Sequence, residues 1–228
     1  MFLRFGSYNI KHGENAELDM SKIAKNIQNA RLDIVGVQEV DQKTERVNGM
    51  DTMKNLSRAT GYEYYAFYKA IDFLGGEYGI AILSKYPIIS TESIVLESGS
   101  NEQRVLGRAE INVNGTLVNF FVTHLSYESL YSRAAQFKQI AIVLKKYDNF
   151  VLCGDFNTSD FNEYSVIENS NTVNNNEYAL MTFPEDNASI DNIVYSAGAW
   201  EFSLPKTLTE NSYSDHYMLY AEGKYKKR

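Results

Sequence analysis

Residues 151–157, with the sequence Val-Leu-Cys-Gly-Asp-Phe-Asn, restrict the folds open to this chain more than any other stretch. Three apolar residues lead into a glycine and then into a carboxylate, an aromatic ring and an amide. This order predicts a buried strand ending in a loop that presents Asp155 and Asn157 outward. Proteins of the α/β class keep their functional groups at such strand ends. Taken alone, the same residues also suit a strand followed by an Asx turn.

The same pattern recurs along the chain, because other apolar runs also border on an acid, an amide or an imidazole. We therefore expect several strand ends to present polar groups at one edge of the fold. Asp191 differs, since it lies inside the otherwise apolar run 190–195. The polar residues at the expected strand ends are Asn9, Glu39, His124, Asp155, Asn157, Asp215 and His216.

Length and composition favour one α/β domain. The chain has 228 residues and lacks a Pro/Gly/Ser-rich linker, so we expect residues 1–228 to form a single domain. The single cysteine, Cys153, excludes an intramolecular disulfide. No secretory signal and no apolar run as long as a membrane span occurs in the sequence given, which predicts a cytoplasmic location.

Charge bears on the partners of the protein. The formal net charge is −7 and the pI about 5.1, so no overall field attracts a phosphate backbone. Nucleic acid is therefore possible as a partner but not favoured, because a local cationic site or a bound metal would have to supply the attraction. The oligomeric state is unknown.

Hydrophobic periodicity predicts helices over residues 19–30, from Met50 to Gly61, and over 128–147, where Leu130, Ala134, Phe137, Ala141 and Leu144 form one stripe. Strands alternate with these helices, and residues 80–122 predict an antiparallel meander with an Asn114-Gly115 turn. Residues 170–177 predict a mobile loop and residues 224–228 a solvated basic tail. The expected fold is two sheets packed face to face with helices outside.

The polar groups limit the chemistry. His124 and His216 have no partner at zinc-ligand spacing, and no Gly-x-Ser-x-Gly motif marks a serine hydrolase. Carboxylates and amides are ligands that Mg²⁺ prefers, and two histidines alongside them can move protons near neutral pH. Together these groups indicate metal-assisted hydrolysis of a phosphate ester.

A family resemblance extends from Ser7 to His216. The chain resembles the endonuclease/exonuclease/phosphatase superfamily, whose successive motifs it matches in order. The resemblance implies a four-layered α/β sandwich, with two mixed and mainly antiparallel sheets, and a phosphoesterase that uses Mg²⁺ or Mn²⁺. The matching stretches are Ser7-Tyr8-Asn9-Ile10, Val37-Gln38-Glu39-Val40-Asp41, Tyr78-Gly79-Ile80-Ala81-Ile82-Leu83-Ser84, Thr123-His124-Leu125, Gly154-Asp155-Phe156-Asn157, Ile190-Asp191-Asn192-Ile193 and Ser214-Asp215-His216.

The resemblance also implies roles for metal and water. Glu39 matches the principal Mg²⁺ ligand, with Asn9 and Asp215 completing the metal neighbourhood. Asp155 and Asn157 match the pair that positions the attacking water and the scissile phosphate.

Further matches concern protons and the phosphate. His216 matches an imidazole that acts as base or binds phosphate, and Asp191 the carboxylate that orients it. His124 and Tyr78 match groups at the phosphate and the leaving group, and Arg108 matches a phosphate-contacting arginine. Asp155 and His216 are both candidates for the base.

Several alternatives remain. Some members carry an acid two residues after the position of Asn9, whereas this chain has Lys11. The number of metal ions, one or two, is therefore left open. No long basic insertion is present, and residues 42–51, 74–77 and 180–184 are expected to frame the pocket. We expect a small or exposed phosphodiester or phosphomonoester as substrate. The alternatives are a nuclease and, outside the enzyme class, a non-catalytic binding module on the same fold.

Overall fold

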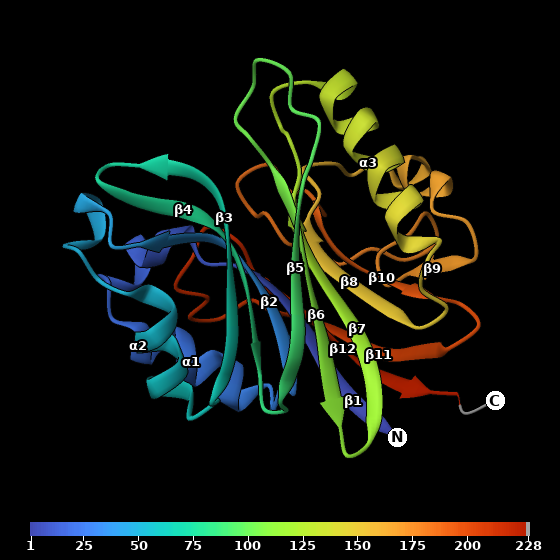
Figure 1. The fold of residues 1–228 in the computed structure, drawn as a ribbon, viewed down its shortest axis with the longest axis horizontal. Coiled ribbons are helices and arrows are strands. Elements are labelled where there is room, and N and C mark those ends of the chain that lie inside the picture. Colours follow the sequence, from blue (N-terminus) through green and yellow to red (C-terminus); the bar gives the residue numbers. More distant parts are fainter. Residues whose placement is uncertain (227–228) are drawn as a thin grey trace.

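The computed structural model describes residues 1–226, which build two mixed sheets of six strands each, with helices outside (Figure 1). The first sheet has the order β11-β12-β1-β2-β4-β3 and the second β5-β6-β7-β8-β10-β9. The strands of the first sheet are β1 (Phe2–Asn9), β2 (Ile34–Gln42), β3 (Tyr64–Phe73), β4 (Gly76–Ser84), β11 (Trp200–Leu208) and β12 (Met218–Tyr225). Those of the second are β5 (Ile88–Val95), β6 (Val105–Val113), β7 (Thr116–His124), β8 (Phe150–Asp155), β9 (Ser170–Thr172) and β10 (Asp191–Ser196).

Both sheets are mainly antiparallel, as expected. In the described chain, β1 runs parallel to β2 in the first sheet and β7 runs parallel to β8 in the second, and the other paired strands are antiparallel. Because parallel neighbours end at the same edge of a sheet, Asn9 and the end of β2 lie together, and so do His124 and Asp155.

Three hydrophobic clusters separate four layers. The cluster between the sheets includes Phe5, Phe120 and Trp200. Helices α1 (Met20–Asn29) and α2 (Thr52–Thr60) cover the outer face of the first sheet, and α3 (Leu130–Leu144) covers the outer face of the second (Figure 1). The short 3₁₀ helices are η1 (Lys11–Ala16), η2 (Glu45–Val47) and η3 (Phe161–Val166). The predicted α/β sandwich with helices outside is confirmed.

Local capping chemistry sets the ends of the helices. The Asp19 side chain accepts a hydrogen bond of 2.9 Å from the Ser21 amide and so begins α1. Gly61, with φ of 74°, ends α2 at the position that favours glycine. No helix among residues 1–226 is long and apolar enough to cross a membrane.

The predicted stripe on α3 is wrong in its first half. Leu130 is 71% exposed, whereas Arg133 and Gln136 face the protein. Arg133 forms an ion pair of 3.0 Å with Glu163 of η3, and Gln136 accepts a hydrogen bond from the Ser126 amide. Polar contacts therefore bury the first turns of α3, which is why apolar spacing failed there, while Phe137 and Leu144 lie in the core as expected.

The predicted meander over residues 80–122 is also wrong at its start. Strand β4 pairs with β2 and β3, so both of its edges are occupied, and β5 begins the other sheet. The turn between β3 and β4 consists of Leu74 and Gly75, which both have positive φ and directly precede β4. The hairpins from β5 through β7 and the Asn114-Gly115 turn follow the prediction.

Two predicted irregular segments are partly ordered in sheets. Ser170–Thr172 pairs with β10 as β9, and the Asn174 side chain is buried and donates to the Asp191 carbonyl at 3.0 Å. At the basic end of the chain, Lys224 pairs with β1 as part of β12. Lys227 and Arg228 of the predicted tail lie outside the described residues.

Close packing between the sheets brings together the strand ends that carry the predicted site residues. A Cβ atom added to Gly36 of β2 would lie 2.9 Å from Val122 of β7 and 3.2 Å from Cys153 of β8. Strand β2 thus approaches the parallel pair of the other sheet more closely than a larger residue allows. The ends of β1, β2, β7 and β8 are therefore neighbours.

The contribution of the core between the two sheets to stability can be tested by mutation. Phe5→Ala should lower the free energy of unfolding by about 3–5 kcal/mol, because Phe5 is buried against Phe120, Trp200 and Phe202. Phe2→Ala, on the same strand but 60% exposed, should change it by less than about 0.5 kcal/mol. Urea unfolding of both variants measures the difference, and equal effects would contradict the described core.

Candidate active site

A pocket of about 450 Å³ opens where these strand ends meet. Asn9 and Asp191 lie beside it through hydrogen bonds to lining residues. Arg108 is absent from its lining. The predicted site residues that line the pocket are Glu39, Tyr78, His124, Asp155, Asn157, Asp215 and His216.

Asn9 joins the two sheets at the base of the site. Its buried amide nitrogen donates to Glu39 Oε1 at 2.9 Å and to Asp155 Oδ2 at 3.0 Å, while its oxygen accepts from the Lys11 amide at 3.0 Å. One amide thereby fixes a carboxylate of each sheet. The two donated bonds are charge-assisted, which makes them stronger than bonds between neutral groups.

Glu39 lies in a bulge of β2. Its φ is 54°, in the left-handed region, and the register with β4 shifts between Val37 and Val40. A non-glycine residue in this conformation is strained, and such strain gathers at functional sites. The bulge removes Glu39 from the alternation of the strand.

Burial and one neighbouring negative charge both act on Glu39. Burial raises the pKa of the Glu39 carboxyl, the hydrogen bond from Asn9 opposes this shift, and the negative charge of Asp215 adds to it. A divalent cation would offset both burial and repulsion, and hard oxygen donors suit Mg²⁺ or Mn²⁺. The carboxylate oxygens of Glu39 and Asp215 therefore fit such an ion, and Asn9 fixes the Glu39 carboxylate beside it through its amide nitrogen.

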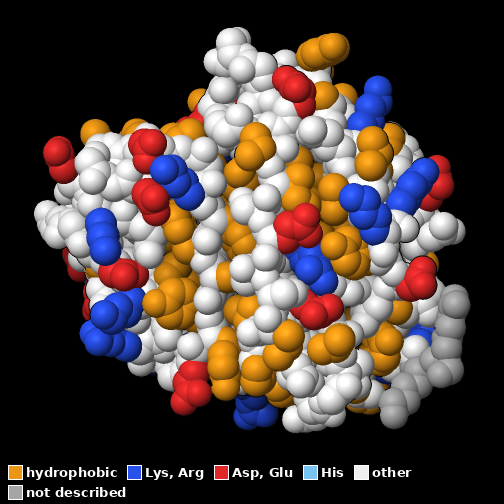
Figure 2. Space-filling view, viewed as in Figure 1, with side chains coloured by type: hydrophobic (Ala, Val, Ile, Leu, Met, Phe, Trp, Pro, Cys, Tyr) orange, Lys and Arg blue, Asp and Glu red, His pale blue; other side chains and the backbone are white. Residues whose placement is uncertain are grey.

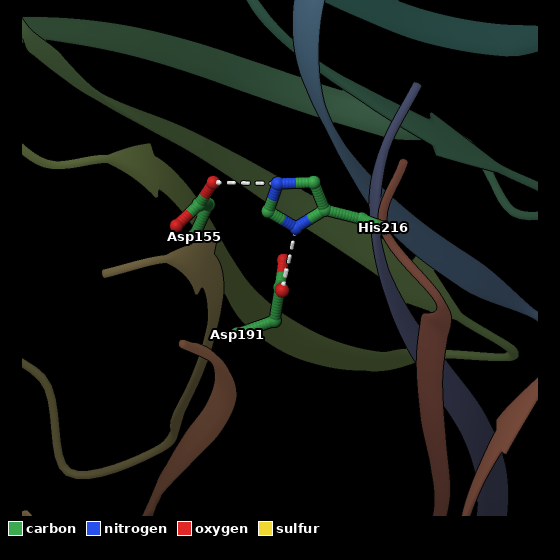
Figure 3. Close-up of side chains that lie close together, drawn as sticks. All are labelled: Asp155, Asp191 and His216. Atoms are coloured by element: carbon green, nitrogen blue, oxygen red, sulfur yellow. Dashed lines mark hydrogen bonds and ion pairs between the residues drawn. The ribbon is translucent and has the colours of Figure 1, made fainter. Parts of the chain in front are cut away.

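His216 lies between two carboxylates (Figure 3). Its Nδ1 atom is 2.9 Å from Asp191 Oδ2, and its Nε2 atom is 3.6 Å from Asp155 Oδ2. Burial lowers the pKa of His216, but the negative charges of Asp191 and Asp155 outweigh it and raise the pKa to about 10. The imidazole is thus held as a cation at neutral pH.

Further hydrogen bonds fix the backbone of Asp191 and the carboxylate of Asp155. The Asp191 amide donates to Thr182 Oγ1 at 3.0 Å, and the Asn157 amide donates to Asp155 Oδ1 at 3.0 Å. Burial, followed by the charge of Asp191, raises the pKa of Asp155 to about 7. Asp155 is therefore poised to exchange a proton near neutral pH.

His124 differs from His216 in its charge state. Its Nε2 atom lies 3.6 Å from Asp155 Oδ2. Burial lowers the pKa of His124 well below its usual value, and the positive charges of Arg104 and His216 lower it further. His124 is consequently a neutral ring, able to donate from one nitrogen and accept at the other.

Arg108, the predicted phosphate-contacting arginine, lies outside the pocket lining. Arg108 donates to Asn119 Oδ1 from Nε at 3.0 Å and from Nη2 at 2.6 Å, and its guanidinium lies 4.8 Å from the Tyr147 ring centre. In the register of β6 and β7, Arg108 pairs with Phe121, away from the strand end that carries His124. Arg108 therefore contacts neighbouring protein groups outside the pocket.

Arg104 lines the pocket instead. It precedes β6, and the same register places it near His124, because Leu106 pairs with Thr123. Arg104 is 3% exposed, and its Nε atom is buried without a hydrogen-bond partner among the described residues. The register of β6 and β7 decides which of the two arginines lines the pocket, and hydrophobic alternation in the sequence does not predict that register.

Of the three segments expected to frame the pocket, one contributes a lining residue. Phe183, from residues 180–184, lies 4.9 Å from the His216 ring, centre to centre. Residues 42–51 and 74–77 do not line it. Residues that the sequence did not single out also line the pocket, namely Glu102, Arg104, Tyr127, Asp186 and Ala188.

Known proteins share this sequence pattern and fold. A family model described as Endonuclease/Exonuclease/phosphatase family matches residues 6–216. No curated protein matches the chain.

Solved structures give the same fold at low identity. An endonuclease/exonuclease/phosphatase from Beutenbergia cavernae has a TM-score of 0.83 at 18% identity, covering 98% of this chain and 72% of that one. A mannosyl-6-phosphatase from Bacteroides thetaiotaomicron has a TM-score of 0.73 at 16% identity, covering 97% and 99%. TDP2 from D. rerio, complexed with a single-stranded DNA product, has a TM-score of 0.76 at 16% identity, covering 98% and 99%.

The charge state of His216 is open to direct measurement. In the metal-free protein, its imidazole should stay protonated through neutral pH and titrate near 10, and Asp191→Asn should lower that midpoint. The raised pKa stabilises the fold fully below pH 6.5, and the contribution disappears as pH rises through 10. NMR titration of the histidine rings measures the midpoints. A normal midpoint for His216 would contradict the described pair.

Proposed function

The chain belongs to the Endonuclease/Exonuclease/phosphatase family, and from this membership and the site geometry we propose that it is a divalent-metal-dependent phosphoesterase. The observation that carries the proposal is the surroundings of Asp155 Oδ2. It accepts a hydrogen bond from Asn9 and lies 3.6 Å from an imidazole nitrogen of both His124 and His216. One buried carboxylate oxygen thus lies within reach of proton-handling groups from several strands.

In this proposal Glu39 and Asp215 hold the metal ion, and Asn9, whose amide nitrogen donates to Glu39, completes the metal neighbourhood by fixing that carboxylate. Asp155, Asp191 and His216 also have ligand atoms within 4.8 Å of one another and could hold an ion. We favour the first set because His216 already shares a proton with Asp191, and because oxygen donors suit Mg²⁺ better than imidazole does. When bound, the ion would neutralise charge that develops on the phosphate.

Lys11 favours a single ion. Its ammonium group lies 3.4 Å from Asp215 Oδ2 and 3.2 Å from Glu14 Oε2. A second cation on this side of Asp215 would be repelled by the lysine. We therefore propose one Mg²⁺ or Mn²⁺ per chain.

The protein side chains then divide the work of hydrolysis. Asp155 accepts a proton from water as the water oxygen bonds to phosphorus and the bond from phosphorus to the ester oxygen breaks. The departing oxygen takes up a proton from solvent water, so the products are an alcohol and a phosphate with one ester bond fewer. Asn157 positions the water with Asp155, and its side chain is itself anchored to the Leu125 carbonyl at 2.9 Å.

The remaining groups bind the phosphate. We assign His216, held by Asp191, and Arg104, with its unpartnered Nε atom, as charged donors to phosphate oxygens. His124 and Tyr78 supply neutral donors from the pocket wall. Asp191 acts through His216 by fixing which ring nitrogen faces the pocket.

A small or exposed phosphate ester is the favoured substrate. Lysine, arginine and acidic side chains are interspersed on the face shown in Figure 2, without a large region of one charge. That face therefore offers no track for a duplex backbone. A nuclease acting on exposed ends is the alternative within the enzyme class. A non-catalytic binding module is less favoured, because none of the candidate catalytic groups around the pocket has been lost.

The metal site has a specific test. Glu39→Gln should weaken Mg²⁺ or Mn²⁺ binding about 100-fold or more and remove hydrolysis of bis-p-nitrophenyl phosphate or p-nitrophenyl phosphate. Calorimetric titration measures the binding, and EDTA should abolish wild-type turnover. Glu63→Gln, at an exposed position before β3, is the matched control and should behave as wild type. Metal binding unchanged in Glu39→Gln would reject this ligand assignment.

The two arginines give a second test. Arg104→Gln should lower kcat/KM about tenfold to 100-fold, because a hydrogen bond between charged groups contributes about 1.5–3 kcal/mol. Arg108→Gln should leave kcat/KM within about twofold, although it loses contacts to Asn119. Steady-state kinetics on p-nitrophenyl phosphate compare the variants, with thermal unfolding to verify that each is folded. The reverse ranking would restore Arg108 to the site.

A further inference from the structure

We propose that Tyr127 is a specificity-determining residue, and that the substrate carries one phosphate on a flat, uncharged ring that stacks on the Tyr127 side chain. This inference rests on the proposed function and adds a substrate class to it. Two independent features of the pocket carry it, namely the aromatic side chains in its wall and the balance of charge within it.

Tyr127 combines exposure with a fixed backbone. It lines the pocket and is 70% exposed, so most of its aromatic surface is open to solvent at the pocket. The two residues before it are buried and anchored, since the Leu125 amide donates to the Asp155 carbonyl at 2.9 Å and the Ser126 amide to Gln136 at 2.9 Å. Tyr127 is therefore held three residues from His124, with its ring available to a ligand.

A second aromatic ring lines the same pocket. Phe183 lies 4.9 Å from the ring of His216, centre to centre, at an interplanar angle of 45°. The backbone around it is anchored, because the Phe183 and Ala188 backbones exchange hydrogen bonds of 2.9 Å. A ring attached to a phosphate bound at His216 thus meets aromatic surface, and stacking on such surface favours flat groups over flexible chains.

The charge in the pocket argues against a second phosphate. Arg104 shares its charge with carboxylates already, because Glu102 lies 3.0 Å from its Nη1 atom and Glu128 lies 3.8 Å from its Nη2 atom, so that only its Nε atom is left for one phosphate. Asp186, which is exposed, adds a further negative charge to the lining. One phosphate can accept a hydrogen bond from the Nε atom of Arg104, whereas a second phosphate in the same pocket would face the carboxylates of Glu102 and Asp186.

The test compares two esters that each carry one phosphate, phenyl phosphate and n-butyl phosphate, with Mg²⁺ or Mn²⁺. Tyr127→Ala should raise KM for phenyl phosphate about tenfold, as base–aromatic stacking energies indicate, and leave KM for butyl phosphate within about twofold. Tyr127→Phe should keep the wild-type values. Tyr131→Ala, four residues on, 85% exposed and outside the pocket lining, is the matched control and should change neither KM.

A second comparison tests the charge. In the wild type, KM for 1,4-phenylene bisphosphate should exceed that for phenyl phosphate severalfold, and Asp186→Asn should narrow the gap by reducing repulsion of the second phosphate. An equal or lower KM for the bisphosphate would overturn the single-phosphate part of the proposal.

The outcomes separate this inference from the proposed function. Hydrolysis of both esters with equal changes of KM in Tyr127→Ala, or with no change, would overturn the ring proposal and leave the phosphoesterase standing. If the wild type hydrolyses neither ester, the phosphoesterase fails on these substrates. Calorimetric binding of phenylphosphonate and butylphosphonate to wild type and Tyr127→Ala then decides the ring proposal alone. Loss of the phenyl preference in the variant supports it, and no preference in the wild type overturns it.

Discussion

The buried carboxylate of Asp155 is the constraint on which the rest of the site depends. It ends β8 at the meeting edge of the two sheets and accepts a hydrogen bond from Asn9 of the other sheet. Burying a carboxylate is costly unless donors and counter-charges surround it. Asn9, the Asn157 amide and the His216 imidazole together supply them. Because these groups must surround Asp155, the positions of the ends of β1 and β8 and of the turn before β12 are fixed.

The same constraint links packing to chemistry. Asn9 and Glu39 come from one sheet, and His124, Asp155 and Asp191 from the other, so neither sheet contains a site by itself. Their spacing depends on how closely the sheets approach, which Gly36 permits by leaving room for Val122 and Cys153. A packing change at this contact therefore alters hydrogen-bond distances in the pocket as well as stability.

Sequence patterns predicted those site residues whose position depends on the local periodicity of strands. Apolar runs that end in polar residues located Glu39, Asp155 and His124, since strand alternation and parallel pairing bring such ends together. The sequence did not predict Arg104 as a pocket residue, because its position depends on strand register. The pairing of β6 with β7 decides that Arg104 rather than Arg108 lines the pocket. The allocation of β4 and β5 to different sheets likewise depends on which edges are already paired.

The two histidines show why residue type alone does not assign chemistry. His216 is a cation because Asp191, paired at 2.9 Å, and Asp155 outweigh the effect of burial. His124 is neutral because burial is reinforced by the positive charges of Arg104 and His216. The neighbours that decide these states are brought close only by folding. Since a charged ring can neutralise a phosphate and a neutral ring can donate and accept, the fold gives one side-chain type two roles around Asp155.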